Sequence, residues 1–364
     1  MNKHFCSTKA APSSESFFSK ACEVFLGGKQ LSNALAQIMI LITGGAGFIG
    51  SAMVWKLNQV GYTDIIIADE LGNSEKWKNL VGLRFADYLH KDDCLQKILS
   101  EKFPRLDAII HMGAISSTTE RNMDLLMRNN YEYTKDLAVF AAQRSIRFIY
   151  ASSAATYGDG SQGYDDDESK LHTLMPLNGY GYSKHLFDLW AQRKNLLNKI
   201  VGLKFFNVFG ANEYHKEEMA SVVFKAYQQI LQTGTVRLFK SHHPKFADGE
   251  QMRDFVYVKD CVEVMFWRLQ NPNVNGIFNL GTGKARTFKD LVAATFAAME
   301  RPVSIEYIPM PEALQGKYQY FTEARMQKLY AAGCPVRFKS LEESVTDYVR
   351  QHLMKPIPYL RATD

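Results

Sequence analysis

The strongest constraint on the fold is a glycine-rich turn that directly follows a short apolar run. Residues 38–42 predict a buried strand, and Thr43-Gly44-Gly45-Ala46-Gly47-Phe48-Ile49-Gly50 comes next, followed by a helical pattern. In such a unit Gly44 permits the tight turn, Gly47 lets the backbone approach a phosphate, and Gly50 lets the helix pack closely on the strand. The N–H groups at the start of such a helix hold a pyrophosphate. The segment therefore predicts the first unit of a dinucleotide-binding fold.

Two acidic residues stand at the ends of the next two expected strands. Residues 62–69 predict a strand that ends on Asp69, about 20 residues past the turn, where a carboxylate meets the ribose of an adenine nucleotide. Residues 84–87 predict the third strand, with Asp87 at its carboxyl end and within reach of an adenine amino group. Both carboxylates are typical of a site for the adenosine half of a dinucleotide.

Strands and helices continue to alternate along the next part of the chain. Residues 107–114 and 147–158 predict two further strands, and residues 92–99 and 129–144 predict helices between them. This alternation predicts the α/β class with a Rossmann doubly wound parallel sheet. Ligands of such sheets bind outside the carboxyl ends of the strands. His111 lies in one of these strands, and we interpret it as a structural residue.

The length of 364 residues suits one large α/β domain and a smaller one. We expect residues 38–205 to form an NAD(P)-binding Rossmann domain and residues 206–364 a smaller α/β substrate-binding region, with the substrate cleft between them. Two expected strands of the second part, 255–258 and 277–281, return to the Rossmann sheet. Residues 1–37 have the character of an extension outside the fold, from an upstream start codon or as an added contact with a partner or another subunit.

Composition excludes several classes of function. The net charge of +5 is spread along the chain without a block of like charges, so we expect no nucleic-acid partner. We expect no membrane contact, because no apolar stretch has the length of a membrane span and no signal peptide is recognisable. Five widely spaced cysteines predict reduced thiols and a cytoplasmic location. The pair His242-His243 lacks a third ligand at a fitting spacing, so we expect no metal.

A tyrosine and a lysine four residues apart predict acid–base chemistry. Tyr180 and Lys184 fall in a segment that predicts a helix over residues 180–197, so they lie on one face, one turn apart. A phenol has a pKa of about 10, and a neighbouring ammonium together with an oxidised nicotinamide favours the phenolate. Ser153 ends an expected strand and can hydrogen-bond the same substrate hydroxyl. The three residues are typical of redox chemistry on an alcohol beside a nicotinamide.

From about residue 38 to its end, the chain resembles the extended short-chain dehydrogenase/reductase superfamily, and within it the ADP-heptose 6-epimerase family. The glycine turn and the Tyr-x-x-x-Lys pattern are typical of the whole superfamily, whereas other motifs are similar to this one family. Those motifs are residues 111–120, 151–158, 205–210, His215-Lys216 with 219–221, 253–258 and 316–319.

The resemblance implies an isomerase that epimerises ADP-D-glycero-D-manno-heptose at C6″ to ADP-L-glycero-D-manno-heptose for the inner core of lipopolysaccharide. It implies one bound NADP per subunit, which takes a hydride from C6″ and returns it to the opposite face of a transient ketone. Tyr180 and Lys216 match the two acid/bases of the family, and Ser153 and Lys184 match supporting residues. The resemblance also implies a homo-oligomer, a pentamer in the family.

Binding residues follow from the same resemblance. Lys76 and Lys91 are the expected partners of a 2′-phosphate, and the planar donors of Arg253 suit a diphosphate. Besides the glycines, Asp69 and Asp87, the expected cofactor-binding residues are Phe48, Ile49, Glu70, Lys76, Lys91, Met112, Gly113, Ala114, Ile115, Ser116, Asn129, Lys184, Val208 and Lys216. The expected substrate-binding residues are Ser153, Asn207, Glu218, Lys225, Phe239, Lys240, Arg253 and Tyr318.

Some positions depart from the family pattern. Glu70 replaces an asparagine and, beside Asp69, would repel a ribose phosphate, which leaves NAD⁺ open as the cofactor. Glu218 replaces a small hydroxyl residue, Lys204 replaces an arginine, and residues 240–250 are longer than the family loop near the ADP moiety. The reaction class is affected less by these changes than the identity of the substrate.

The sequence leaves three alternatives to the function that the resemblance implies. A nucleotide-sugar 4-epimerase of the same superfamily is the first, and a 4,6-dehydratase is disfavoured because residues 154–156 lack the acidic pair of that class. A non-catalytic NADP(H)-binding regulator is disfavoured because Ser153, Tyr180 and Lys184 are all intact.

Overall fold

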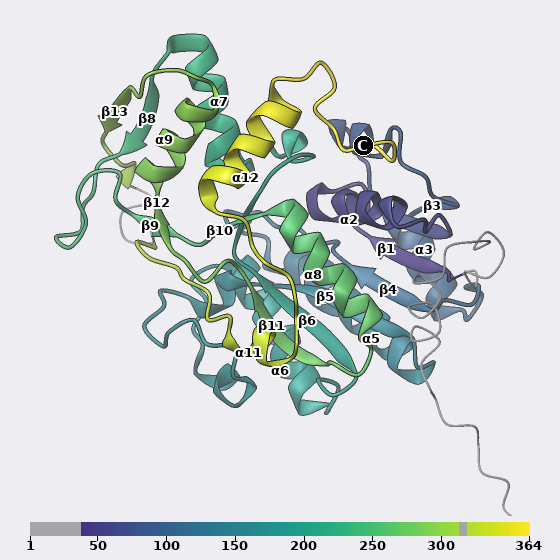
Figure 1. Ribbon diagram of the computed structural model, residues 1–364. Coiled ribbons are helices and arrows are strands. Elements are labelled where there is room, and N and C mark those ends of the chain that lie inside the picture. The colour runs from purple at the N-terminus through teal and green to yellow at the C-terminus, as the bar shows by residue number, and fades with distance from the viewer. Residues whose placement is uncertain (1–37, 313–318) are drawn as a thin grey trace, which may run out of the picture.

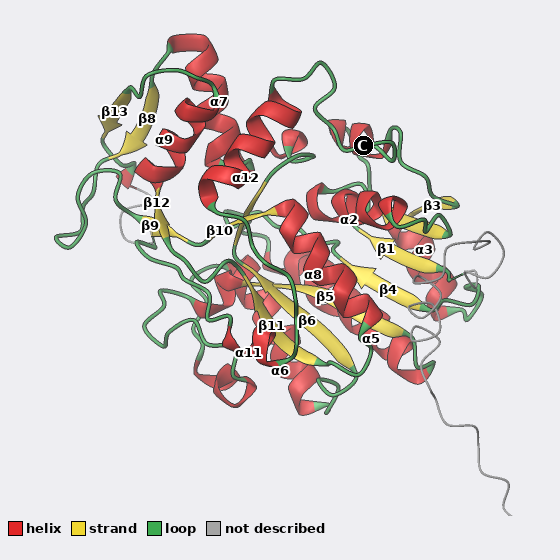
Figure 2. Cartoon of the chain, in the orientation of Figure 1, coloured by secondary structure: helices red, strands yellow, loops and turns green. Residues whose placement is uncertain are grey.

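The computed structural model describes residues 38–312 and 319–364, so the expected extension over residues 1–37 lies outside the described residues. A parallel sheet of seven strands forms the centre, in the order β11-β6-β5-β4-β1-β2-β3 (Figures 1 and 2). This arrangement confirms the predicted doubly wound α/β fold. The strands are β1 (Ile40–Thr43), β2 (Ile65–Asp69), β3 (Asp87–His90), β4 (Ala108–His111), β5 (Arg147–Ser153), β6 (Ile200–Phe205) and β11 (Gly276–Leu280).

Helices cover both faces of the sheet. The helix after the glycine turn, α2 (Phe48–Gln59), packs against α8 (Val258–Gln270) on one face, seen in front of the sheet in Figure 1. The other face carries α3 (Lys91–Leu99), α5 (Tyr133–Gln143) and α6 (Gly179–Arg193). Because both faces are covered, the central strands are apolar without alternation, and the residues of β1 and β4 are buried throughout.

The region predicted as one helix over residues 129–144 is divided into three parts. It begins earlier, with α4 (Met123–Leu126), continues as a π-helical turn, η3 (Met127–Glu132), and ends as α5. The prediction that the helix begins at residue 129 was therefore wrong. The π turn shifts the hydrophobic periodicity, so the turns before it were not recognised as part of the same helix. Such turns occur frequently at functional sites, and Asn129 and Asn130 lie in this one.

Three small sheets lie beside the main one. They pair β7 (Asn207–Phe209) with β10 (Phe255–Tyr257), β9 (Met252–Arg253) with β12 (Arg286–Thr287), and β8 (Val236–Phe239) with β13 (Ile305–Ile308). β11 joins the main sheet beside β6, as predicted. The prediction that residues 255–258 return to the main sheet was wrong, because β10 pairs with β7 instead. The N–H of Asn207, the first residue of β7, donates to the carbonyl of Asp254 at 3.1 Å.

The remaining helices complete the second part of the chain. The central helix is α9 (Phe288–Ala298), which contacts both α7 (Val222–Thr233) and α12 (Leu341–Tyr348). The short helices are η2 (Glu75–Leu80), η4 (Ala154–Tyr157), η5 (Glu168–Thr173), η6 (Tyr214–Met219), α11 (Gln327–Ala331) and η7 (Val349–Leu353).

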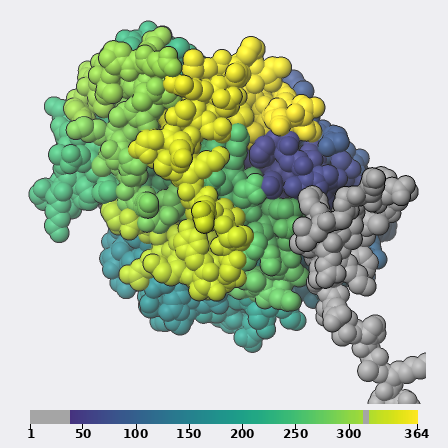
Figure 3. Space-filling model, viewed as in Figure 1, coloured from purple at the N-terminus to yellow at the C-terminus, as the bar shows by residue number. Residues whose placement is uncertain are grey.

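The C-terminal residues cross the surface and end beside the first α/β unit, as the yellow and purple atoms in Figure 3 show. The N–H of Leu360 donates to Asn212 Oδ1 at 3.0 Å, and the N–H of Ala362 donates to the carbonyl of Gly82 at 3.1 Å. The last residues of the chain are thus tied to both of its parts.

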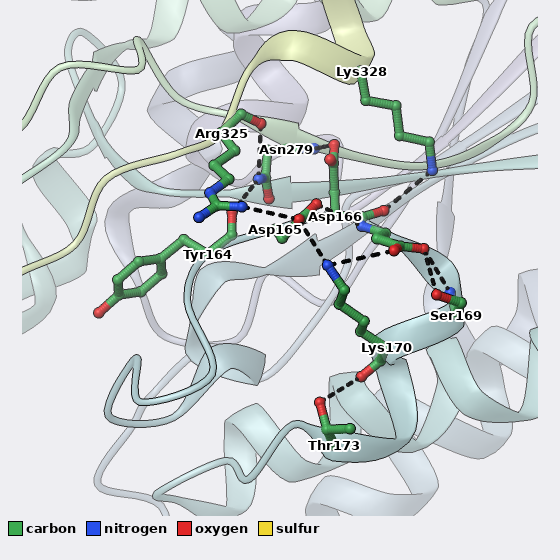
Figure 4. Close-up of polar contacts among 10 residues, drawn as sticks. Tyr164, Asp165, Asp166, Ser169, Lys170, Thr173, Asn279, Arg325 and Lys328 are labelled. Carbon is green, nitrogen blue, oxygen red and sulfur yellow. Dashed lines mark hydrogen bonds and ion pairs between the residues drawn. The ribbon is translucent and has the colours of Figure 1, made fainter.

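A polar network fixes the segment that leads into α6 (Figure 4). Asn279 of β11 donates from its backbone N–H to Asp166 Oδ2 at 2.7 Å and from its side chain to the carbonyl of Tyr164 at 2.8 Å. Arg325 and Lys170 both pair with Asp165, at 3.1 and 3.2 Å. The edge strand therefore holds residues 164–170, and with them the approach to α6.

Candidate active site

The glycine turn leaves no room for side chains. Gly44 has a φ of +66°, and a Cβ on it would lie 2.5 Å from the backbone N of Gly113. A Cβ on Gly50 would collide with the carbonyl oxygen of Gly44. The turn, α2 and the end of β4 therefore approach one another as closely as backbones can, and they leave an open cradle at the start of α2 that fits a pyrophosphate.

A cleft of about 530 Å³ lies at the carboxyl ends of the central strands and brings most of the predicted residues together. Those that line it are Gly44, Gly47, Phe48, Ile49, Gly50, Asp69, Lys76, Met112, Gly113, Ala114, Ile115, Ser116, Ser153, Tyr180, Lys184, Val208 and Lys216. Glu70, Lys91 and Asn129 line an adjoining cavity of about 370 Å³, which shares Asp69, Lys76 and Gly113 with the first.

Some lining residues were not predicted from the sequence. They are Ser74, Ser117, Ala151, Ser152, Phe205, Phe206, His215 and Met219 in the cleft, and His111, Leu125 and Tyr133 in the adjoining cavity. All of them except Ser74, Leu125 and Tyr133 lie in the motifs that resemble the family, so the resemblance offered a signal for them. Asn130 was also not predicted. Its side chain accepts a hydrogen bond from the N–H of Ile115 and donates to the carbonyl of Ile115 and to Ser183 Oγ at 3.1 Å, which links the loop after β4 to α6.

Tyr180, Lys184 and Ser153 meet where β5 and α6 face each other. Asn178 caps α6 by accepting a hydrogen bond from the N–H of Gly181 at 2.8 Å, which fixes the first turn that carries Tyr180. Burial raises the pKa of the Tyr180 phenol, while its hydrogen bond with Ser153 lowers it. Burial also lowers the pKa of the Lys184 ammonium to about 8, against the opposing effect of Asp188. Phenol and ammonium are thus both displaced toward their neutral forms.

Lys216 reaches the same cleft from another element, η6. Its Nζ lies 5.4 Å from the centre of the Phe48 ring, and burial lowers its pKa while the carboxylate of Glu213 raises it. Glu217 beside it has a φ of +47°, a conformation that costs a non-glycine residue free energy and persists where the surroundings enforce it. A buried lysine with a lowered pKa is suited to exchange a proton with a substrate.

Comparison with known proteins agrees with this geometry. A sequence model of the NAD dependent epimerase/dehydratase family matches residues 40–281. The ADP-L-glycero-D-manno-heptose-6-epimerase of Nitratidesulfovibrio vulgaris strain DP4 is 61% identical over 323 residues, which cover 88% of this chain and 100% of that protein. The chain belongs to the ADP-L-glycero-D-manno-heptose-6-epimerase family. This confirms the resemblance inferred from the sequence.

Two further relatives support the same family. The ADP-L-glycero-D-manno-heptose-6-epimerase of Fusobacterium nucleatum is 51% identical over 332 residues, which cover 88% of this chain and 100% of that protein. The crystal structure of the Helicobacter pylori enzyme of the same name superposes with a TM-score of 0.73 at 27% identity, covering 86% of this chain and 96% of that one.

In this member of the family, the residues expected at the adenosine ribose are already paired with one another. Asp69 accepts hydrogen bonds from the N–H of Ala46 at 2.8 Å and from Lys76 Nζ at 2.7 Å. Lys91 pairs with Glu70 at 2.6 Å, and this contact lowers the pKa of the Glu70 carboxyl. The two lysines and two carboxylates therefore compensate each other in charge at the position where the resemblance predicts a 2′-phosphate.

The position expected for Asp87 was wrong. β3 runs from Asp87 to His90, with Asp87 opposite Ile66 and His90 opposite Asp69. Asp87 therefore begins the strand at the amino edge of the sheet and is exposed, and Lys91 follows the carboxyl end instead. Residues 84–86 precede the strand because pairing with β2 determines its register.

Of the substrate-binding residues expected from the family, Ser153 lines the cleft, whereas the others that the structure describes do not. Glu218 and Lys225 pair with each other at 3.1 Å, with Glu218 fully exposed. Arg253 is buried in β9 and donates from Nη1 to the carbonyl of Met252 at 2.8 Å. Asn207 begins β7, Phe239 ends β8 and Lys240 follows it, whereas Tyr318 lies outside the described residues. Their roles remain predictions.

The long segment over residues 240–250 folds on itself beside Tyr320. The N–H of His242 donates to the Tyr320 hydroxyl at 3.1 Å, and the His243 ring lies 5.0 Å from the Tyr320 ring. Within residues 38–312 and 319–364, no three His, Cys, Asp or Glu residues are placed to hold a metal ion. In the same ranges no helix combines the length and apolar character needed to cross a bilayer.

Proposed function

We propose that this chain converts ADP-D-glycero-D-manno-heptose into ADP-L-glycero-D-manno-heptose, a step in the synthesis of the inner core of lipopolysaccharide. The observation that carries the proposal is that Tyr180 and Lys216, two groups able to exchange protons, line one cleft from separate elements. Inversion by oxidation and reduction needs a proton carrier for each face of the intermediate ketone. The 61% identity to proteins with this name supports the choice of substrate.

The reaction needs redox chemistry because C6″ carries no acidic hydrogen. A bound nicotinamide supplies the oxidation and the reduction that reverses it. Tyr180 accepts the proton of the C6″ hydroxyl on one face, and Lys184, one turn along α6, stabilises the phenolate. Ser153 hydrogen-bonds the substrate oxygen, and Lys216 exchanges the proton with the oxygen after the ketone has turned over. Over one turnover Tyr180 gains a proton and Lys216, which protonates the new alkoxide, loses one, so proton exchange with solvent restores both groups before the next cycle.

We infer a nicotinamide cofactor, and NADP in preference to NAD. Gly44 and Gly50, which exclude a Cβ, support the first inference. Lys76 and Lys91 support the second, since both border the cavity beside Asp69. Their pairing with Asp69 and Glu70 opposes it, so NAD⁺ remains the alternative.

A panel of nucleotide sugars tests the function. We expect the purified protein to invert C6″ of ADP-D-glycero-D-manno-heptose without added cofactor, as followed by NMR, and to leave UDP-glucose and UDP-galactose unchanged. Turnover of a UDP-hexose instead would favour the 4-epimerase alternative. Tight cofactor binding with no turnover of any sugar would favour the non-catalytic regulator.

The setting of the enzyme is also a proposal. Cys94, Cys261 and Cys334 are free and buried, which supports a reducing cytoplasm. We propose that the protein is a homo-oligomer. A monomer mass measured by light scattering would contradict this proposal. We also propose that residues 206–364 bind the substrate and that residues 1–37 are dispensable. A chain that starts at Met39 should keep full activity and assembly.

A further inference from the structure

A buried ion pair lies beneath the catalytic residues. Lys204 Nζ of β6 is 2.8 Å from Asp188 Oδ2 of α6, and both side chains are fully inaccessible to solvent. Two more donors converge on the same carboxylate: the Tyr150 hydroxyl at 2.9 Å and Ser152 Oγ at 2.7 Å. Three donors therefore converge on the Asp188 side chain.

The pair connects to both elements that carry the catalytic groups. On α6, Asp188 lies one turn from Lys184 and two turns from Tyr180, on the same face. Just beyond β5, Lys204 Nζ donates to Thr156 Oγ1 of η4 at 2.6 Å, and Thr156 Oγ1 donates to the carbonyl of Ser153, the last residue of β5, at 2.8 Å. A displacement of Asp188 or Lys204 would therefore reach Lys184 through α6 and Ser153 through the turn after β5.

Charge near Lys184 comes from few groups among the described residues. Its own helix offers Asp188 and Tyr180, while β4 offers His111, whose imidazole is neutral because burial holds its pKa well below the usual value. His111 also bonds Thr43 Oγ1 and Thr134 Oγ1. β6 and β5 contribute Lys204 and Tyr150, which both contact Asp188. Asp188 is thus the carboxylate that offsets the desolvation of Lys184.

We propose that Asp188 and Lys204 are positioning residues for the epimerisation, Asp188 by keeping Lys184 protonated and Lys204 by limiting the charge of Asp188 and fixing the Ser153 turn. The inference rests on the proposed function for its kinetic consequence alone. A purely structural pair, by contrast, would affect folding but not the titration of Lys184.

The two single neutral variants have opposite expected effects. In Asp188→Asn the counter-charge is gone and Lys204 is left unpaired, so Lys184 loses its proton at lower pH. In Lys204→Met the positive charge that partly neutralises Asp188 is removed. The carboxylate then acts more strongly on Lys184, which keeps its proton to higher pH. Lys204→Arg retains the charge and is the conservative control, expected to titrate as the wild type does.

Two readouts test the proposal on the full-length protein. The first is the pH profile of kcat and KM for epimerisation, in which the alkaline limb should move by about one pH unit downward in Asp188→Asn and upward in Lys204→Met. KM should stay within about twofold of wild type, because neither side chain touches the cleft. The second is the titration of Lys184 itself, followed by NMR in protein labelled with ¹³C-lysine and assigned by the signal missing from Lys184→Arg.

The outcomes separate this inference from the proposed function. Wild-type protein that does not epimerise contradicts the function, while the NMR titration still decides the role of the pair. Limbs and titrations that stay in place, or that move in the same direction in both variants, would overturn the inference. If Asp188→Asn does not fold, Lys204→Met compared with Lys204→Arg decides alone: a Lys184 titration equal in both excludes the role.

Discussion

Lys216 Nζ lies 5.4 Å from the centre of the Phe48 ring, so this lysine packs against the first residue of the helix that follows the glycine turn. Tyr180 reaches the same cleft from α6. The nucleotide turn and both proposed proton carriers therefore line one cavity. This arrangement allows a substrate carbon to be oxidised and reduced without leaving the site.

Loss of either proton carrier should abolish turnover. Tyr180→Phe and Lys216→Met remove one acid/base each, and we expect kcat for epimerisation to fall by about 10²–10⁴-fold in both. The matched controls are Tyr182→Phe, two residues along α6 and largely exposed, and Lys199→Met, exposed beyond α6. Steady-state assays by NMR or chromatography measure the effect. A rate above one-tenth of wild type in either test variant would exclude that residue as an acid/base.

Replacement of Glu70 should shift the cofactor preference. In Glu70→Asn the ion pair with Lys91 is lost, so Lys91 is available to a 2′-phosphate. We expect the ratio of NADP⁺ to NAD⁺ affinity to rise about tenfold, by calorimetry on protein stripped of cofactor. Glu75→Gln is the control, since Glu75 is exposed on η2 and lines neither cavity. An unchanged ratio would mean that Glu70 points away from the phosphate when the cofactor is bound.

Acid should destabilise the fold in part through His352. Burial lowers the pKa of this side chain to about 4, and its Nδ1 donates to the carbonyl of Pro358 at 3.1 Å. As the pH falls, His352 is protonated at about pH 6.5 in the unfolded chain but only at lower pH in the folded protein. Its contribution to the free energy of unfolding is therefore fully present above about pH 6.5 and declines below it. His352 should contribute a slope of about 1.4 kcal/mol per pH unit down to about pH 4.

Urea unfolding at several pH values measures this slope. His352→Gln should lower the free energy of unfolding at neutral pH, because the bond to Pro358 is lost, and should make its decline in acid shallower. His172→Gln, at an exposed position, should leave the slope unchanged. Parallel pH dependences in wild type and His352→Gln would contradict the account.

Arg253 should matter for binding of the diphosphate. Arg253→Lys keeps the charge but loses the planar pair of donors, and we expect the Kd for ADP to rise about tenfold or more. Calorimetry with ADP measures it, with Arg237→Lys as control, because Arg237 is exposed and paired with Glu306. Equal affinity in Arg253→Lys and wild type would restrict Arg253 to a structural role.

Sequence patterns with several concordant features were reliable. The strand, glycine turn and helix at residues 40–59 and the helix that carries Tyr180 and Lys184 were predicted because local geometry and chemistry agree there. Pairing decided the rest: β3 begins at Asp87 by its register with β2, and β10, three residues long, pairs with β7. Lys204 stood out in the sequence only as a departure, since its burial against Asp188 depends on the packing of α6 on the sheet.

The most direct test of the central claim is epimerisation in D₂O. Wild-type protein is incubated with ADP-D-glycero-D-manno-heptose without added cofactor, and C6″ is followed by proton NMR. The account predicts inversion in which C6″ keeps its ¹H, because the hydrogen returns without exchange with solvent. Deuterium at C6″ would show inversion by proton abstraction, and no inversion even after addition of NADP⁺ or NAD⁺ would contradict the function itself.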